Sequence, residues 1–298
     1  MHASVLSEAP TASVRTLLDR GYTLPASWYT DPDVYADEQR HIFRRSWQYV
    51  GLTEQVASPG DFFRCQAGNV PLIVTRDEAN DLHAHVNVCR HRGAELVSEA
   101  CGSRKALQCP YHAWTYGLDG SLRAAPGMRE EPGFNRGDFG LIQARIDTWG
   151  PFVFVNPDPA APSLESVLAE LPELTVASGL RLDDVKRRVR HHYDIAANWK
   201  VVVDNYLECY HCPVAHPGFS ALIDTQNYTV AEYDYFSTQG GPLKEAAPNE
   251  PTLYDTTGEV KDGFYAFLWP NFTINVYPGP GILSINLFLP LAVDKTRA

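Results

Sequence analysis

Two short cysteine–histidine pairs constrain this chain more than any other feature of its sequence. Cys89 and His91 form a C-x-H pair in NVCRHRG, and Cys109 and His112 form a C-x-x-H pair in QCPYHAW. Two thiolates and two imidazoles held on such loops can bind a [2Fe–2S] cluster of Rieske type, in which two histidines replace two cysteines on one iron. This replacement raises the reduction potential of the cluster. The sequence therefore predicts an electron-transfer site.

A structural zinc site is the main alternative, because zinc also binds Cys and His ligands. Zinc sites usually use C-x₂₋₄-C and H-x₃₋₅-H pairs, and a C-x-H pair is unusual among them. Gly93 and Pro110 follow the pairs, where tight loops need backbone freedom or a fixed φ. The spacing therefore favours the iron–sulfur cluster. The remaining cysteines lack this pattern: Cys65, Cys101, Cys209 and Cys212.

A second group of polar residues lies in LECYHCPVAHP, where Glu208, His211 and His216 are spaced E-x-x-H-x₄-H. We expect a helix here, on which a spacing of three places Glu208 and His211 on one face. Pro213 should disturb that helix, so that His216 can turn back toward His211. Two imidazoles and a carboxylate with open positions are the ligands of non-haem Fe(II) oxygenases. The spacing thus indicates a mononuclear iron site.

Two other interpretations of this segment remain open. It could be a polar helix end without a metal, because short motifs match by accident. A zinc site could also form from Cys209, Cys212, His211 and His216, since C-x-x-C pairs bind zinc well. The combination of a Rieske-type motif with a later histidine-rich helix favours iron over both.

Composition limits the partners and the compartment. The formal net charge of −11 argues against binding to nucleic acid or to anionic membranes. The amino terminus lacks the basic start and apolar run of a signal peptide, and proline and asparagine interrupt the apolar stretch near residue 285. A reducing cytoplasm is the expected location for six cysteines and an iron–sulfur motif.

The pattern along the chain predicts an α+β protein with three parts. Residues 1–46 form an amino-terminal helical segment, with an amphipathic helix expected over 31–48. Residues 47–157 contain short β-rich segments and form a small all-β domain that carries the cluster. A Pro/Asp-rich break follows, and residues 158–298 form an α+β domain with an antiparallel sheet. Asn198 is the expected amino-terminal cap of its histidine-rich helix.

With both motifs in place, the chain resembles the α subunits of Rieske non-haem iron oxygenases, from about Trp28 to the end. The resemblance implies that Cys89, His91, Cys109 and His112 bind the cluster. It also implies that the iron ligands are His211 and His216, and that Glu208 is the catalytic relay. In this family a bridging carboxylate passes electrons to the iron from the cluster of a neighbouring subunit, and α₃ homotrimers are common. The segment DNYLECYHCPVAHP resembles that of the branch acting on choline, betaine or carnitine more than that of the naphthalene-type dioxygenases.

One departure from the family concerns the third iron ligand, an Asp on a helix downstream of the final strands. After His216 the chain offers no aspartate in a matching context; the candidates are Asp224, Asp234, Asp255, Asp262 and Asp294. We therefore expect that the chain is truncated at its carboxyl end and that this ligand lies beyond Ala298.

The activity that the resemblance implies is that of a terminal oxygenase. A reductase oxidises NADH or NADPH and supplies electrons singly, and O₂ then hydroxylates or oxidatively N-demethylates a small substrate. The similarity of this segment favours a quaternary ammonium substrate, and a box of aromatic side chains is expected to bind its cation. The aromatic residues available for it are Tyr206, Tyr210, Phe219, Tyr228, Tyr265, Phe267, Trp269 and Tyr277. Two alternatives are an aromatic-ring dioxygenase and a non-enzymatic electron-transfer protein without a working iron site.

Overall fold

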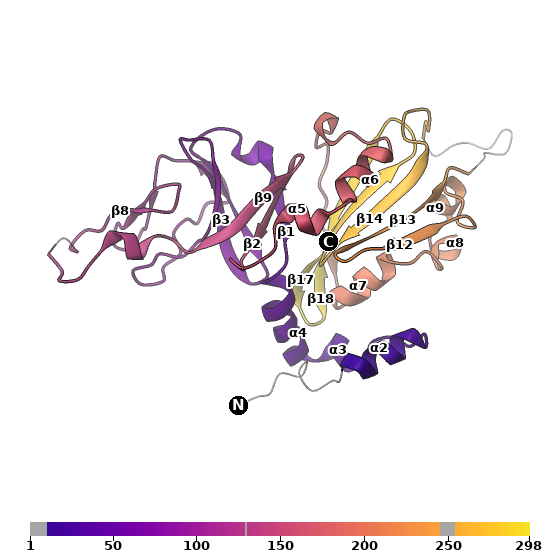
Figure 1. Ribbon diagram of the computed structural model, residues 1–298, viewed down its shortest axis with the longest axis horizontal. Coiled ribbons are helices and arrows are strands. Elements are labelled where there is room, and N and C mark those ends of the chain that lie inside the picture. Colours follow the sequence, from indigo (N-terminus) through magenta and orange to yellow (C-terminus); the bar gives the residue numbers. More distant parts are fainter. Residues whose placement is uncertain (1–10, 129, 245–253) are drawn as a thin grey trace. The chain divides into compact units, whose positions relative to one another are not determined.

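The computed structural model describes residues 11–128, 130–244 and 254–298, so residues 1–10 of the expected amino-terminal segment lie outside it. Its contacts divide the chain into two compact units (Figure 1). One is Gln39–Leu164, and the other joins the residues up to Glu38 with Glu165–Ala298. Within the described residues, no helix has the length and apolar composition that crossing a bilayer requires.

The unit Gln39–Leu164 is built from short antiparallel strands, as the β-rich segments predicted. A seven-stranded sheet has the order β1-β10-β9-β4-β3-β2-β5, and a smaller sheet has the order β6-β7-β8. The strands are β1 Gln48–Leu52, β2 Asp61–Ala67, β3 Val70–Arg76, β4 Leu82–Val86, β5 Cys101–Ser103, β6 Leu107–Gln108, β7 Thr115–Tyr116, β8 Leu122–Ala124, β9 Gln143–Trp149 and β10 Phe152–Asn156. Short helical turns lie at η1 Gln39–Phe43, η2 Thr53–Val56 and η3 Arg136–Phe139.

Two apolar cores stabilise this unit. One contains Leu72, Val74 and Val153, which belong to strands β3 and β10 of the large sheet. The other contains Trp114 and Tyr116 and lies between the large sheet and the loops that carry the cysteine–histidine pairs. Each large side chain buried in this way stabilises the fold by about 1.5–3 kcal/mol. The loops of the predicted cluster site are therefore part of a packed core.

The second unit contains an antiparallel sheet of order β12-β13-β14-β15-β16 and a small sheet of order β11-β18-β17. Its strands are β11 Asp194–Ile195, β12 Thr229–Glu232, β13 Phe236–Pro242, β14 Asp262–Leu268, β15 Phe272–Tyr277, β16 Ile282–Leu287, β17 Leu289–Ala292 and β18 Lys295–Arg297. Its helices are α2 Thr11–Asp19, α3 Ser27–Thr30, α4 Pro32–Glu38, α5 Leu164–Leu168, α6 Leu171–Ala177, α7 Trp199–Tyr206, α8 Cys212–Ala215 and α9 Pro217–Leu222, with a 3₁₀ turn at η4 Leu182–Asp184. The predicted α+β class is confirmed.

The helix that precedes the histidine-rich segment is fixed at its start. Asn198 caps α7 as predicted, because its side chain accepts a hydrogen bond of 3.0 Å from the Lys200 N–H. The buried Glu38 carboxylate accepts hydrogen bonds from Trp199 Nε1 at 2.8 Å and from Lys200 Nζ at 2.5 Å. A buried ion pair with these extra hydrogen bonds is costly to break. It therefore anchors α7 against the end of α4.

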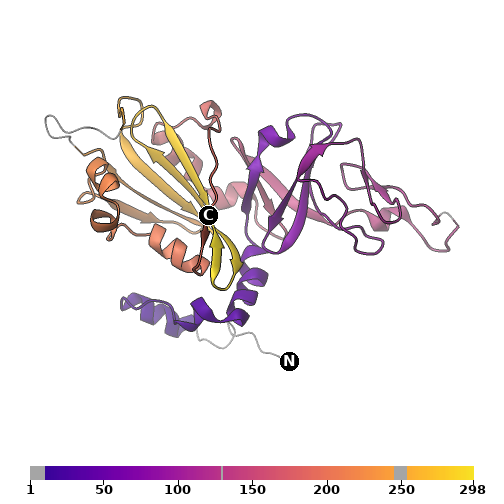
Figure 2. The same cartoon turned by 180° about the vertical axis from the view of Figure 1, so that it is seen from behind.

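Two expected helices are shorter in the structure. The helix expected over 31–48 consists of α4 and one π-helical turn, and Gln48 already begins β1. The histidine-rich helix ends at Tyr206, and residues 207–211 form a turn before α8. Helix α6 crosses in front of the β12–β16 sheet in Figure 1, while α7 and α9 pack on the other face, seen from behind in Figure 2.

Candidate metal centres

The cysteine–histidine pairs lie on two loops with the same backbone geometry. One loop follows β4, and the other connects β6 and β7. The Gly93 N–H donates to the Cys89 carbonyl at 3.0 Å, and the Ala113 N–H donates to the Cys109 carbonyl at 3.1 Å. Gly93 and Ala113 have φ values of 69° and 57°, in the left-handed region. Each loop thus turns back sharply after its histidine.

The side chains on these loops form a set of metal-binding atoms. The Cys89 and Cys109 thiols are buried, and the His91 and His112 rings lie 4.7 Å apart. Among the described residues, neither buried Nδ1 atom of these histidines has a hydrogen-bond partner. A buried polar atom without a partner costs about 1–3 kcal/mol, a cost that metal coordination at both nitrogens would remove. Two buried thiols and two unpartnered nitrogens fit the donor set of a Rieske cluster.

Two further residues support this site, and the sequence reasoning missed both. The Trp114 ring stacks on the His91 ring at 4.8 Å with an angle of 7°. The Tyr116 hydroxyl accepts a hydrogen bond of 3.1 Å from the Arg90 N–H and lies 3.3 Å from Cys89 Sγ, to which it can donate. Burial and the Cys89 contact raise the pKa of Tyr116 and keep its proton. The sequence feature that could have indicated them is the placement of Trp114 and Tyr116 at alternate positions after the Cys109–His112 pair.

The second predicted site is assembled at a turn. His211 Nδ1 donates to Glu208 Oε1 at 2.5 Å, and the Tyr210 N–H donates to Glu208 Oε2 at 2.5 Å. The His211 and His216 rings lie 5.0 Å apart. Because Glu208 occupies Nδ1 of His211, its Nε2 is the nitrogen that remains for a metal ion. The predicted proximity of the three residues is thus confirmed, although a turn and not a helix brings Glu208 to His211.

Charge at this site is concentrated on Glu208. Its partial burial raises the pKa of the carboxyl group, but hydrogen bonds from His211 and the Tyr210 N–H outweigh that effect and lower the pKa overall. Asp204, which precedes it on α7, instead accepts a hydrogen bond of 2.8 Å from the Tyr29 hydroxyl. Burial and this bond raise the pKa of Tyr29 to about 12. Glu208 is therefore the carboxylate that orients His211.

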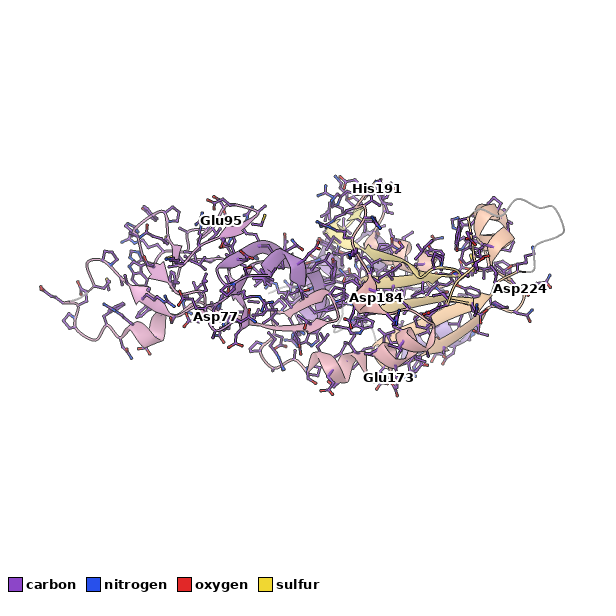
Figure 3. The ribbon with its side chains drawn as sticks, turned by 90° about the horizontal axis from the view of Figure 1, so that it is seen from above. Asp77, Glu95, Glu173, Asp184, His191 and Asp224 are labelled. Carbon is purple, nitrogen blue, oxygen red and sulfur yellow. A yellow bond between two sulfur atoms is a disulfide. The ribbon has the colours of Figure 1, made fainter. Side chains whose placement is uncertain are left out.

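The described residues do not supply a third iron ligand. Across the described ranges, no three His, Cys, Asp or Glu side chains form a group that could hold one ion. Asp224, which follows α9 (Figure 3), instead accepts hydrogen bonds from the Gln226 N–H and the Asn227 side chain. The four cluster residues do not form such a group either, because a Rieske cluster divides two thiolates and two imidazoles between two irons and each iron takes only two of them. At the predicted mononuclear site the structure thus places two imidazoles and one orienting carboxylate.

A disulfide joins Cys209 and Cys212 on either side of His211. Sulfurs that are bonded to each other are not thiolates and cannot bind zinc. The zinc site that the sequence allowed from these cysteines, His211 and His216 is therefore absent from this form of the protein.

Aromatic side chains gather on the sheet face beside α7 and α9. Tyr265 contacts Phe219 at 5.6 Å, Tyr277 at 5.6 Å and Tyr228 at 6.5 Å between ring centroids. Tyr206 on α7 donates its hydroxyl to Asn275 Oδ1 at 2.8 Å. We call Phe219, Tyr228, Tyr265 and Tyr277 the aromatic cluster.

Two of the expected aromatic residues lie elsewhere. Tyr210 is 97% exposed, and Trp269 follows the end of β14 and packs on Trp199.

Burial raises the pKa values of Tyr228 and Tyr265 in the aromatic cluster, so both remain neutral phenols. The cluster is thus composed of uncharged rings.

Comparison with known proteins identifies both units. Residues 46–145 match the Rieske [2Fe-2S] domain, and residues 182–298 match the ring hydroxylating alpha subunit (catalytic domain). The carnitine monooxygenase oxygenase subunit of Acinetobacter pittii is 32% identical over 93% of this chain and 74% of its own length. The chloroplastic choline monooxygenase of Arabidopsis thaliana is 36% identical over 94% of this chain and 67% of its own length.

Solved structures agree with these matches. A quaternary ammonium Rieske monooxygenase in complex with L-carnitine superposes with a TM-score of 0.78 at 31% identity, covering 92% of this chain and 73% of that one. Naphthalene 1,2-dioxygenase from Rhodococcus has a TM-score of 0.77 at 22% identity, covering 96% of this chain and 74% of that one. The second likeness extends to the fold alone.

Proposed function

Because this chain belongs to the Rieske non-haem iron oxygenases, as an α subunit that takes electrons from a reductase and uses O₂, we propose that it oxidises a quaternary ammonium compound. In this proposal the cluster is bound by Cys89, His91, Cys109 and His112, and the iron by His211 and His216. When bound, the two groups supply single-electron transfer and O₂ activation.

The observation that carries the substrate proposal is the position of the aromatic cluster. Phe219 lies three residues after His216, about one helical turn away, and contacts both Tyr228 and Tyr265. Ring faces attract a cation that approaches to within about 6 Å, by roughly 0.5–2 kcal/mol. An N-methyl ammonium group bound there would bring a methyl carbon close to His216. Two relatives of this chain are named carnitine monooxygenase and choline monooxygenase, which supports the same substrate class.

The residues of this chain divide the remaining work. Glu208 accepts the His211 Nδ1 proton and so fixes the tautomer and orientation of that ring. The apolar surroundings of Cys89 and Cys109 keep water away from the buried thiols. When Cys89 is a thiolate, the Tyr116 hydroxyl can donate to it and stabilise negative charge on that sulfur.

We propose that Glu208 also bridges His211 and a cluster-binding histidine of a neighbouring subunit in a homotrimer, so that electrons can pass between the subunits. Its side chain is 48% exposed, so a second imidazole can approach it from outside the chain. Another matching structure, also of a quaternary ammonium Rieske monooxygenase, gave insights into inter-subunit electron transfer in that protein. A cytoplasmic location remains a prediction from the sequence.

Substrate oxidation tests the proposed class. With a competent reductase, we expect O₂ uptake coupled to product formation with choline, glycine betaine, carnitine or proline betaine. The uncharged tert-butyl analogue of an active ammonium should be turned over far less well. Replacing Tyr265 by Leu should raise KM for the ammonium by about tenfold, while Tyr265→Phe, which keeps the ring, should not. Coupled turnover of naphthalene and none of the ammonium compounds would instead support a ring dioxygenase.

A change at Tyr116 tests the cluster assignment. Hydrogen bonds to cluster sulfurs contribute to the reduction potential. The Tyr116→Phe variant loses the hydroxyl beside Cys89 Sγ but keeps the ring in its core position. We expect its potential to fall by roughly 30–60 mV, because 59 mV corresponds to about 1.4 kcal/mol for one electron. Protein-film voltammetry measures this shift, and Tyr111→Phe, whose exposed ring lies on the loop before β7, is the matched control. An unchanged potential would refute the contact.

A further inference from the structure

We propose that Cys209 and Cys212 form a reversible thiol–disulfide site that consumes hydrogen peroxide released at the neighbouring iron site. The assignment rests on the membership in the oxygenase family and is independent of the substrate class. Its premise is chemical. O₂ that receives two electrons and two protons without oxidising a substrate leaves as hydrogen peroxide.

The two cysteines flank His211, one of the proposed iron ligands, where such peroxide would form. They form a C-x-x-C motif with His211 between them, and Glu208 directly precedes the first. Their Cα atoms are 5.0 Å apart, a separation that a disulfide spans without movement of the backbone. Cys209 is partly exposed, whereas Cys212 is only 6% exposed. Peroxide can therefore reach the first sulfur, and the second is placed to resolve the product.

The bonded form leaves the iron-site residues in place. With the disulfide present, His211 Nδ1 donates to Glu208 Oε1 at 2.5 Å, and the two histidine rings lie 5.0 Å apart. The turn between α7 and α8 thus accommodates the disulfide together with the Glu208–His211 hydrogen bond. Oxidation of this pair is therefore compatible with retention of iron. A modification that only inactivated the protein would not be compatible with it.

The other cysteines lack this combination of proximity and access. Cys89 and Cys109 are buried among the cluster residues, and Cys65 is a free thiol in strand β2. Cys101 is exposed, but it lies in the other unit, on β5, and forms no disulfide. Cys101 therefore serves as an internal control for general oxidation.

The reaction balances without an additional oxidant. The Cys209 sulfur attacks one peroxide oxygen, the O–O bond breaks, and one water leaves, giving a sulfenic acid. The Cys212 sulfur then attacks the Cys209 sulfur, the S–O bond breaks, and a second water leaves with the disulfide. In total, two thiols lose two electrons and two protons, and one peroxide becomes two waters. A dithiol reductant of the thioredoxin class restores the pair by exchange.

A single O₂ exposure of the whole protein tests the proposal. The protein is reduced with dithionite and a dithiol, freed of both under nitrogen, and given O₂ without substrate, with catalase in the solution. Alkylation and peptide mass spectrometry then report each cysteine. We expect loss of alkylation at both Cys209 and Cys212, a mass decrease of about 2 Da in their peptide, and unchanged labelling of Cys101. Iron content should be unchanged, and the cluster should return to the visible spectrum of its oxidised form.

Variants distinguish this site from general thiol oxidation and from metal binding. In Cys212→Ser, the Cys209 thiol should accumulate the sulfenic acid, whereas in Cys209→Ser the buried Cys212 should remain a thiol and Cys101→Ser should behave as the parent protein. Two results would overturn the proposal: both thiols remain alkylable after O₂ in the presence of catalase, or one zinc per chain binds the reduced pair. The first would exclude local supply of peroxide, and the second would assign the thiolates to a metal.

Discussion

Replacing Glu208 by Gln should lower product formation by roughly 100-fold while both metal sites stay occupied, in line with the loss of an orienting carboxylate beside a metal ligand. The amide has nearly the same shape and can still accept a hydrogen bond from His211 Nδ1. It removes the negative charge that stabilises His211 and that we propose links the two metal centres. Single-turnover reoxidation of the reduced cluster, followed by its visible absorption, should slow by a similar factor.

Two variants control for this change. Glu208→Asp keeps the carboxylate and should retain most of the activity, provided that the shorter side chain still reaches His211. Asp204→Asn removes a neighbouring carboxylate whose partner is Tyr29, and it should leave the reoxidation rate unchanged. Parent-like turnover in the Glu208→Gln protein, with iron and sulfide intact, would show that this residue does not serve as the relay.

Replacing His216 by Ala should remove the mononuclear iron and leave the cluster. The described residues place only two imidazoles at this site, so loss of one leaves His211 alone to hold the ion. We expect total iron to fall from about three to about two atoms per two acid-labile sulfides, because the Rieske cluster accounts for two irons. Elemental analysis with sulfide determination gives this ratio, and substrate oxidation should fall below detection.

The matched control for this variant is His191→Ala, which removes an exposed histidine that is not among the proposed metal ligands (labelled in Figure 3). It should keep the parent ratio of iron to sulfide. Retention of the third iron in the His216→Ala protein would contradict the assignment of His216, whatever the activity.

The sequence alone predicted the parts of this protein in which local chemistry determines the structure. The cysteine–histidine pairs and their glycine indicated tight ligand loops, and the alternation near Tyr265 indicated antiparallel strands. Both features depend on short-range spacing. Asn198 was identifiable as a helix cap for the same reason.

Features that depend on tertiary contacts could not be read from spacing. Periodicity extended α7 through His211, whereas the chain leaves the helix after Tyr206 and Glu208 reaches His211 across a turn. A side-chain amide on a distant strand contributes nothing to periodicity, yet Gln239 Nε2 donates to the Tyr206 carbonyl at 2.6 Å at this helix end. The hydroxyl of Tyr116 beside Cys89 is a further contact of this kind.

We propose that electron transfer by this chain depends on a cluster with mixed thiolate and imidazole ligands at Cys89, His91, Cys109 and His112. Pulsed electron paramagnetic resonance of the dithionite-reduced protein tests this most directly, because it detects nitrogen nuclei bound to the cluster. We predict couplings from two imidazole nitrogens, one of which disappears in the His91→Cys variant. A reduced protein without nitrogen couplings, or without a paramagnetic cluster, would contradict this ligand assignment.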